Sequence, residues 1–211
     1  MFTKMSVLTN RRSVMTLYAN EADLIGHCVR LVLTEKDINV EIHFIDEETK
    51  PEDLNALNPY AKVLTLIDRD LVLYDAQIML EYLDERYPHP PLMPVDPVSR
   101  ANNRQFRFRI VRDLFTLAEV LDGDNDIAAA NARKSLRDNL MALAPIFAQN
   151  PYFMSQEFSL TDMCMGPLLW RLPHYGVKLT AQAKPLVKYA DKLFERRAFQ
   201  SSLSPAEQEM R

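Results

Sequence analysis

The sequence has few glycines and lacks the common nucleotide-binding and hydrolase signatures. Its 211 residues contain four glycines, and none are spaced as GxGxxG or GxxxxGK[ST], which excludes the Rossmann and P-loop phosphate cradles. The four histidines are too far apart for HExxH, and no GxSxG elbow occurs. The first fifteen residues contain no apolar core of roughly 7–15 residues as expected of a secretory leader, and no run approaches the roughly 18 apolar residues that span a bilayer. We therefore predict a cytoplasmic protein with no membrane partner.

Cysteine is also scarce, and the acidic residues outnumber the basic ones. The two cysteines, Cys28 and Cys164, have neither metal-knuckle nor redox-pair spacing, so we expect reduced thiols that pack in the core and no metal site. The net charge is −4. Because affinity for the phosphate backbone comes mainly from Lys and Arg, this charge argues against direct DNA binding.

Apolar periodicity predicts a mixture of strands and helices in the first half of the chain. Asp23 is a candidate N-cap for the first helix, which we expect to end near Lys36. The expected elements are strands over 13–18 and 38–45 on either side of that helix, a short helix over 51–57 with Pro51 at its first position, a hairpin of strands over 63–67 and 71–73, and a helix over 75–87.

The second half has only helical periodicity, and it begins after the proline cluster PHPPLMPVDP. Ser159 and Asp162 form a candidate capping box, in which a hydroxyl and a carboxylate satisfy free N–H groups at a helix start. We expect helices over 99–121, over 126–147, from 159 to Trp170, and around 186–194. The tail over 201–211 is expected to fray, with contact to a partner as the alternative for its charged residues. The predicted division is a first domain over 12–88, a linker over 89–98 and a helical domain over 99–205.

This order of elements resembles the glutathione transferase fold across nearly the whole chain. The segments Asn58-Pro59 and Glu81–Pro88 are similar to first-domain motifs of that superfamily, and the capping box at Ser159 resembles its second-domain folding motif. The resemblance implies an N-terminal thioredoxin-like βαβαββα domain followed by an all-helical domain.

Five longer segments are similar to a narrower family. RRSVMTLY, VRLVLTEK, EYLDERYPHPPLMPV, FSLTDMC and PLLWRLP resemble the stringent starvation protein A family of bacterial transcription regulators that bind RNA polymerase. This resemblance implies a dimeric protein that acts on RNA polymerase holoenzyme, sigma factor included, during starvation or stress.

Three positions depart from a working glutathione transferase site. Transferases need a thiol-activating Ser, Tyr or Cys near the first helix, and this chain has Ala19 before a turn with two acids, Glu21 and Asp23, that oppose a thiolate. Leu64 replaces the superfamily's cis proline. A cis bond before a non-proline residue costs about 2.5–4 kcal/mol, so we expect a trans Val63–Leu64 peptide.

The third departure lies at the helix that begins near residue 75. Asp75 matches an acid that holds the γ-glutamyl group in transferases, but Ala76 replaces the serine beside it. Asp75 is equally well explained as a helix N-cap. We therefore predict no catalytic residues, no metal and no resident cofactor.

The proline segment Pro88, His89, Pro90 and Pro91 has two explanations. Proline fixes φ, so the segment is either a rigid interdomain linker or an ordered docking surface that binds at little entropic cost. The resemblance favours docking, because the matching surface of the family is implicated in transcription activation. Asp96 stands where that family often has an aromatic residue, which indicates a different partner at the rim.

Three arginines, Arg100, Arg104 and Arg107, share one face of the long helix. One explanation is ion pairing at a dimer interface with the acids Glu81, Asp84 and Glu85. The other is an anion site in the dimer crevice, for instance for the alarmone guanosine tetraphosphate, because guanidinium groups match phosphate oxygens.

The first hypothesis from the sequence is a non-enzymatic dimeric adaptor that binds RNA polymerase holoenzyme or a separate DNA-binding activator. The dimer is either a homodimer or a heterodimer with a paralogue. The alternatives are a glutathione-dependent transferase or peroxidase with a degenerate site, and a structural subunit that dimerises without a ligand.

Overall fold

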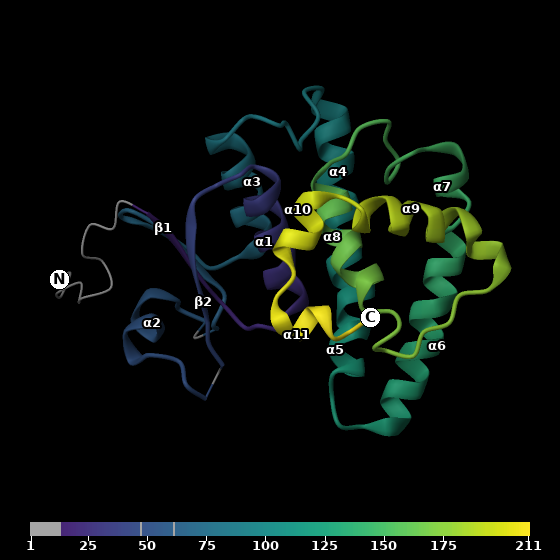
Figure 1. Cartoon of the computed structure of the whole chain (residues 1–211), viewed down its shortest axis with the longest axis horizontal. Coiled ribbons are helices and arrows are strands. Elements are labelled where there is room, and N and C mark those ends of the chain that lie inside the picture. Colours follow the sequence, from purple (N-terminus) through teal and green to yellow (C-terminus); the bar gives the residue numbers. More distant parts are fainter. Residues whose placement is uncertain (1–13, 47, 61) are drawn as a thin grey trace.

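The computed structural model describes residues 14–46, 48–60 and 62–211. Its first half is a four-stranded sheet with helices, and its second half is a bundle of helices (Figure 1). The elements of the first half are β1 (Met15–Ala19), α1 (Leu24–Glu35), β2 (Val40–Phe44), α2 (Glu52–Leu57), β3 (Thr65–Asp68), β4 (Leu71–Leu73) and α3 (Ala76–Arg86). Residues 12 and 13 of the predicted first domain lie outside the described residues.

The sheet has the order β2-β1-β3-β4. β1 and β2 are parallel, with Leu17 opposite Ile42, and α1 connects them, which confirms the predicted βαβ unit. β3 runs antiparallel to β1 and forms a hairpin with β4. Arg69 takes the left-handed conformation in that hairpin, with φ 58°. Pro51 is the N-cap of α2 rather than its first helical residue, a difference of one position.

The second half contains α4 (Pro97–Arg109), η2 (Ile110–Phe115), α5 (Thr116–Leu121), α6 (Asp126–Leu143), α7 (Ile146–Gln149), α8 (Leu160–Trp170), η3 (Ala181–Ala183), α9 (Lys184–Phe194), α10 (Arg197–Ser202) and α11 (Pro205–Gln208). The long helix predicted over 99–121 is interrupted by η2, a π-helical stretch. The helix predicted over 126–147 is divided in two near Pro145, because proline has no N–H to donate to the helical ladder.

One continuous apolar core joins the two halves. It runs from β1 and α1 to α8 and α9, and the capping box of Ser159 and Asp162 is present at the start of α8. Cys28 on α1 and Cys164 on α8 are fully buried, as expected, and their thiols contact each other. The structure thus brings together two cysteines that their sequence separation had placed apart.

The chain end is ordered, so the expectation of a frayed tail was wrong. α10 and α11 lie against the first half beside α1 (Figure 1). Glu207 of α11 has no exposed surface, and Ser204 and Glu207 form a second capping box. Within residues 14–46, 48–60 and 62–211, no helix has both the length and the apolar character that crossing a membrane requires.

Candidate functional site

At the turn before α1, where transferases activate the glutathione thiol, a side chain of this chain accepts hydrogen bonds from the backbone N–H groups at the helix start. Asp23 caps α1 and accepts hydrogen bonds from the backbone N–H groups of Ile25 at 3.2 Å and Gly26 at 3.0 Å. Burial raises the pKa of Asp23 above its ordinary range, against the hydrogen bonds that lower it. These N–H groups would otherwise stabilise an anion at the helix start. The capping role predicted for Asp23 is confirmed.

Leu64, at the position of the superfamily's cis proline, and Ala76, at the position of its serine, also differ from a transferase. Among the described residues the cis peptide is His89–Pro90, and the Val63–Leu64 bond is trans, as expected. Asp75 caps α3 by accepting the N–H of Ile78 at 3.1 Å, and Ala76 beside it is buried.

A buried charge cluster ties the chain end to this turn. The Glu207 carboxylate accepts hydrogen bonds from Arg30 at 2.6 Å and from Arg171, and all three side chains are nearly inaccessible to water. Arg171 also donates to the carbonyl oxygen of Ala22 at 3.1 Å. Glu21 was predicted to oppose a thiolate; instead its backbone oxygen accepts the Ser204 hydroxyl at 2.8 Å and its carboxylate accepts the N–H of Ala206 at 3.2 Å.

His27 belongs to the same cluster, and its surroundings disfavour the charged ring. Burial lowers its pKa well below the ordinary value, and the nearby positive charges of Arg171 and Arg30 lower it further. Its Nδ1 accepts from Arg171 at 3.0 Å, and its Nε2 lies 3.0 Å from the Ser202 hydroxyl. A neutral ring satisfies both contacts, because Nδ1 then acts as an acceptor and Nε2–H as a donor.

The proline segment is exposed to solvent on its outer side and bonded to buried charged residues on its inner side. Pro88, His89, Pro90 and Pro91 are all exposed. Beneath them the buried ammonium of Lys36 donates to the carbonyl oxygens of Tyr87 at 2.5 Å and of Pro90 at 2.8 Å.

Asp84 completes this support from α3. Its carboxylate lies 2.8 Å from Lys36 Nζ and accepts the backbone N–H of Leu92 at 2.9 Å. We call Lys36 and Asp84 the clamp. Because the clamp fixes both ends of the segment through charged hydrogen bonds, the exposed prolines have a defined shape.

The three predicted arginines lie together along α4, and each has a partner on the same chain. Arg104 forms a bidentate pair with Glu81, with contacts of 2.7–3.1 Å. Arg107 is buried and also donates to Glu81. Arg100 lies 3.6 Å from Glu85. Asp84 had been expected to pair with an arginine and pairs with Lys36 instead.

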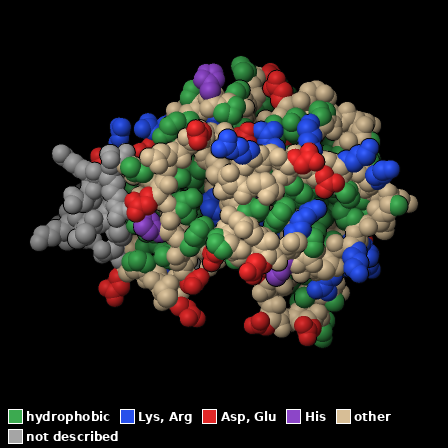
Figure 2. Space-filling model, in the orientation of Figure 1, with side chains coloured by type: hydrophobic (Ala, Val, Ile, Leu, Met, Phe, Trp, Pro, Cys, Tyr) green, Lys and Arg blue, Asp and Glu red, His purple; other side chains and the backbone are tan. Residues whose placement is uncertain are grey.

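Glu81 is the centre of this ion-pair group. Partial burial raises its pKa, but the hydrogen bonds from Arg104 and Arg107 outweigh burial and leave the pKa below its ordinary value. A phosphate at these arginines would have to displace a carboxylate that is ionised at neutral pH. Over the face drawn in Figure 2, acidic and basic side chains are mixed rather than separated into one basic patch.

The chain is similar to known proteins over most of its length. A family model described as glutathione S-transferase, N-terminal domain, matches residues 26–91. A stringent starvation protein A homolog of Coxiella burnetii is 46% identical over 202 residues, which are 95% of this chain and 97% of that protein. A protein of the same name from Haemophilus influenzae is 47% identical over 204 residues, 96% of each chain.

The chain belongs to the stringent starvation protein A family. Its fold is that of the glutathione transferases. A theta class glutathione S-transferase from Xanthomonas axonopodis pv. citri superposes with a TM-score of 0.82 at 19% identity, over 91% of this chain and 98% of that one. At that identity the likeness concerns the fold alone.

Sequence patterns did not reveal the two charged residues that hold the turn before α1 and the proline segment. Lys36 had been treated as the end of a helix and Glu207 as part of a frayed tail. The Ser204–Glu207 pair has the spacing of a capping box, and this signal could have revealed α11. Nothing in the local sequence pairs Lys36 with Asp84, because the two residues are 48 positions apart.

Proposed function

We propose that the protein is a non-enzymatic, dimeric adaptor that binds RNA polymerase holoenzyme and changes promoter use during starvation or stress. The observation that carries this proposal is the clamp of Lys36 and Asp84, which presents Pro88–Pro91 as an exposed and ordered surface. A segment that is ordered before binding loses little conformational entropy on docking. The family of the chain supports the choice of partner.

A second copy or a paralogue would pair through the face formed by α3 and β4. Leu71 and Ile78 are exposed there, Ile78 to 57%, and a hollow lies between them and Glu81. Ile78→Asp should convert the dimer to a monomer, because a buried unpaired carboxylate opposes association. Sedimentation equilibrium measures this change, and Ile127→Asp, at an exposed residue of α6, is the matched control.

The decisive experiment is co-elution of the purified chain with RNA polymerase holoenzyme. His89→Ala and Pro90→Ala should abolish co-elution while circular dichroism shows an intact fold. His174→Ala and Pro173→Ala change the same residue types at exposed positions outside the segment and should co-elute like the parent. Co-elution that survives both segment variants contradicts docking through the prolines.

No polymerase binding by the homodimer or by a heterodimer with a paralogue would contradict the adaptor itself. A separate DNA-binding activator is then the alternative partner, and it is tested in the same way. Guanosine tetraphosphate at Arg100, Arg104 and Arg107 stays a hypothesis. Titration calorimetry that gives no heat with either dimer would exclude it.

A further inference from the structure

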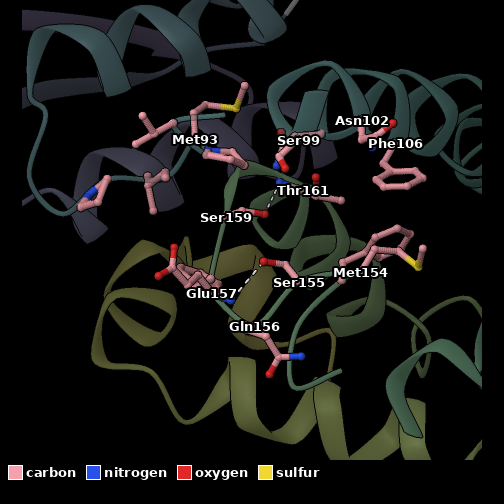
Figure 3. A pocket seen from close by; sticks show the side chains of 17 residues that line it. Met93, Ser99, Asn102, Phe106, Met154, Ser155, Gln156, Glu157, Ser159 and Thr161 are labelled. Carbon is pink, nitrogen blue, oxygen red and sulfur yellow. Dashed lines mark hydrogen bonds between the residues drawn. The ribbon is translucent and has the colours of Figure 1, made fainter. Parts of the chain in front are cut away.

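A hollow of about 440 Å³ lies apart from the turn before α1. Its walls are the linker over 91–95, the first turns of α4 and the loop over 153–159 that precedes α8 (Figure 3). Of the proline segment, only Pro91 reaches this hollow. Its volume is within the range of about 300–1,000 Å³ found for ligand pockets.

The lower wall is a preformed loop. Tyr152 and Ser155 exchange backbone hydrogen bonds of 3.2 and 3.5 Å, and Met154 between them is left-handed with φ 51°. The N–H of Phe153 donates to the Asp162 carboxylate at 2.9 Å, and its ring lies 5.5 Å from the ring of Phe106. The two rings give the hollow an apolar wall that needs no rearrangement to accept a side chain.

Thr161 supplies an unpaired polar group to this hollow. Its side chain is 1% exposed, and its hydroxyl oxygen has no hydrogen-bond partner in the described part of the chain. Its backbone N–H donates to Ser159 Oγ at 3.3 Å, so the local capping arrangement does not use the hydroxyl. A buried hydroxyl without a partner is unfavourable, and a ligand group that bonds to it removes that penalty.

The remaining lining groups select the chemistry of the ligand. Asn102 and Ser99 place an amide and a hydroxyl group at the hollow (Figure 3), and these groups match the donors and acceptors of a peptide backbone. The Gln156 amide points away from it and donates to Asn150 at 3.2 Å. Glu157 is exposed and is the charged side chain among the lining residues. A carboxylate here favours a cationic neighbour and repels an anionic one.

From these observations we infer that the hollow binds an extended peptide segment of a partner protein, with a large apolar side chain against Phe106 and Phe153 and a basic residue beside Glu157. A peptide amide of the segment bonds to the Thr161 hydroxyl. This inference goes beyond the adaptor proposal, because the hollow shares only Pro91 with the proline segment and the inference holds whichever protein supplies the peptide.

The probes are two capped dipeptides, N-acetyl-Phe-Lys-amide and N-acetyl-Phe-Glu-amide, titrated into the ¹⁵N-labelled full chain. The lysine peptide should shift the backbone amide signals of Met93, Phe153 and Thr161, and it should bind about two- to fivefold more tightly than the glutamate peptide. In Glu157→Gln the two affinities should become equal. Equal affinities in the parent chain, or no shifts at these amides, would overturn the inference.

Thr161→Val tests the hydroxyl with a change of nearly equal shape. Affinity for the lysine peptide should fall about two- to tenfold, while the thermal midpoint stays the same or rises, because the lost hydroxyl bonds to nothing. Thr116→Val, at an exposed threonine of α5, should leave affinity unchanged. Unchanged affinity in Thr161→Val, or a lowered midpoint, would overturn the role of Thr161.

His89→Ala separates this inference from the adaptor proposal. That variant should lose polymerase co-elution and bind the lysine peptide with the affinity of the parent chain. A loss of peptide binding in His89→Ala would contradict a site distinct from the proline segment.

Discussion

The turn before α1 and the proline segment are both held by buried charged side chains, but the backbone at the turn is bonded to the chain end, whereas the proline segment is left exposed. At the turn, Glu207 and Arg171 fasten the chain end over the backbone of Ala22. At the proline segment, Lys36 and Asp84 lie underneath and leave the outer surface free. In a fold shared with transferases, the backbone groups of the turn before α1 are therefore bonded by this chain's own side chains, whereas the proline segment is exposed.

The difference also shows how much each region depends on distant parts of the chain. The turn before α1 depends on Arg171 at the end of α8 and on Glu207 of α11, whereas the clamp lies wholly within residues 36–92. The following changes test this contrast, from the largest expected effect to the smallest.

Glu207→Ala should have the largest effect on stability. It leaves Arg30 and Arg171 buried without their shared carboxylate, and breaking a buried ion pair in this way costs about 3–5 kcal/mol. Urea unfolding measures the change in free energy of unfolding. Glu209→Ala, two residues on and exposed, should change it by less than about 0.5 kcal/mol. Similar midpoints for the two variants would contradict the sealing role of the cluster.

Lys36→Met should cost about 3 kcal/mol, because the Asp84 carboxylate stays buried without its cation. The backbone amide of Leu92, which donates to Asp84, should exchange its hydrogen faster. Binding to polymerase should become weaker. Lys178→Met, at an exposed position, is the matched control. Unchanged exchange at Leu92 would show that the prolines hold their own shape without the clamp.

The stability of the fold should decrease at acidic pH, because His27 is harder to protonate in the folded chain than in the unfolded chain. Its pKa in the folded chain lies well below the ordinary value near 6.5, so between the two values the unfolded chain binds more protons. The free energy of unfolding therefore decreases as the pH falls below about 6.5, by at most about 1.4 kcal/mol per pH unit. His27→Gln should flatten this part of the urea-midpoint profile, and His174→Gln should not.

Restoring the transferase residues should have the smallest effect. Leu64→Pro combined with Ala76→Ser returns two superfamily contacts, but Asp23 still occupies the N–H groups at the start of α1. We therefore expect no glutathione binding by titration calorimetry. Measurable heat with the double variant would show that the turn before α1 is less closed than its hydrogen bonds indicate.

Local patterns were sufficient for most elements of the fold. The apolar periodicity of 24–36, the turn at 68–70 and the capping box at Ser159 all depend on residues close together in sequence, and each appears in the structure. The departures of Ala19, Leu64 and Ala76 from a transferase site were likewise visible as residue types.

Tertiary structure alone decided which distant charges meet. Lys36 with Asp84, Glu207 with Arg30, and the contact of Cys28 with Cys164 join residues separated by 48 to 177 positions, and no local periodicity encodes such pairs. The unpaired hydroxyl of Thr161 is also a property of packing, because whether a side chain finds a partner depends on which segments close around it. Sequence determined the elements of this protein, and burial of charges between elements decided which surfaces are open.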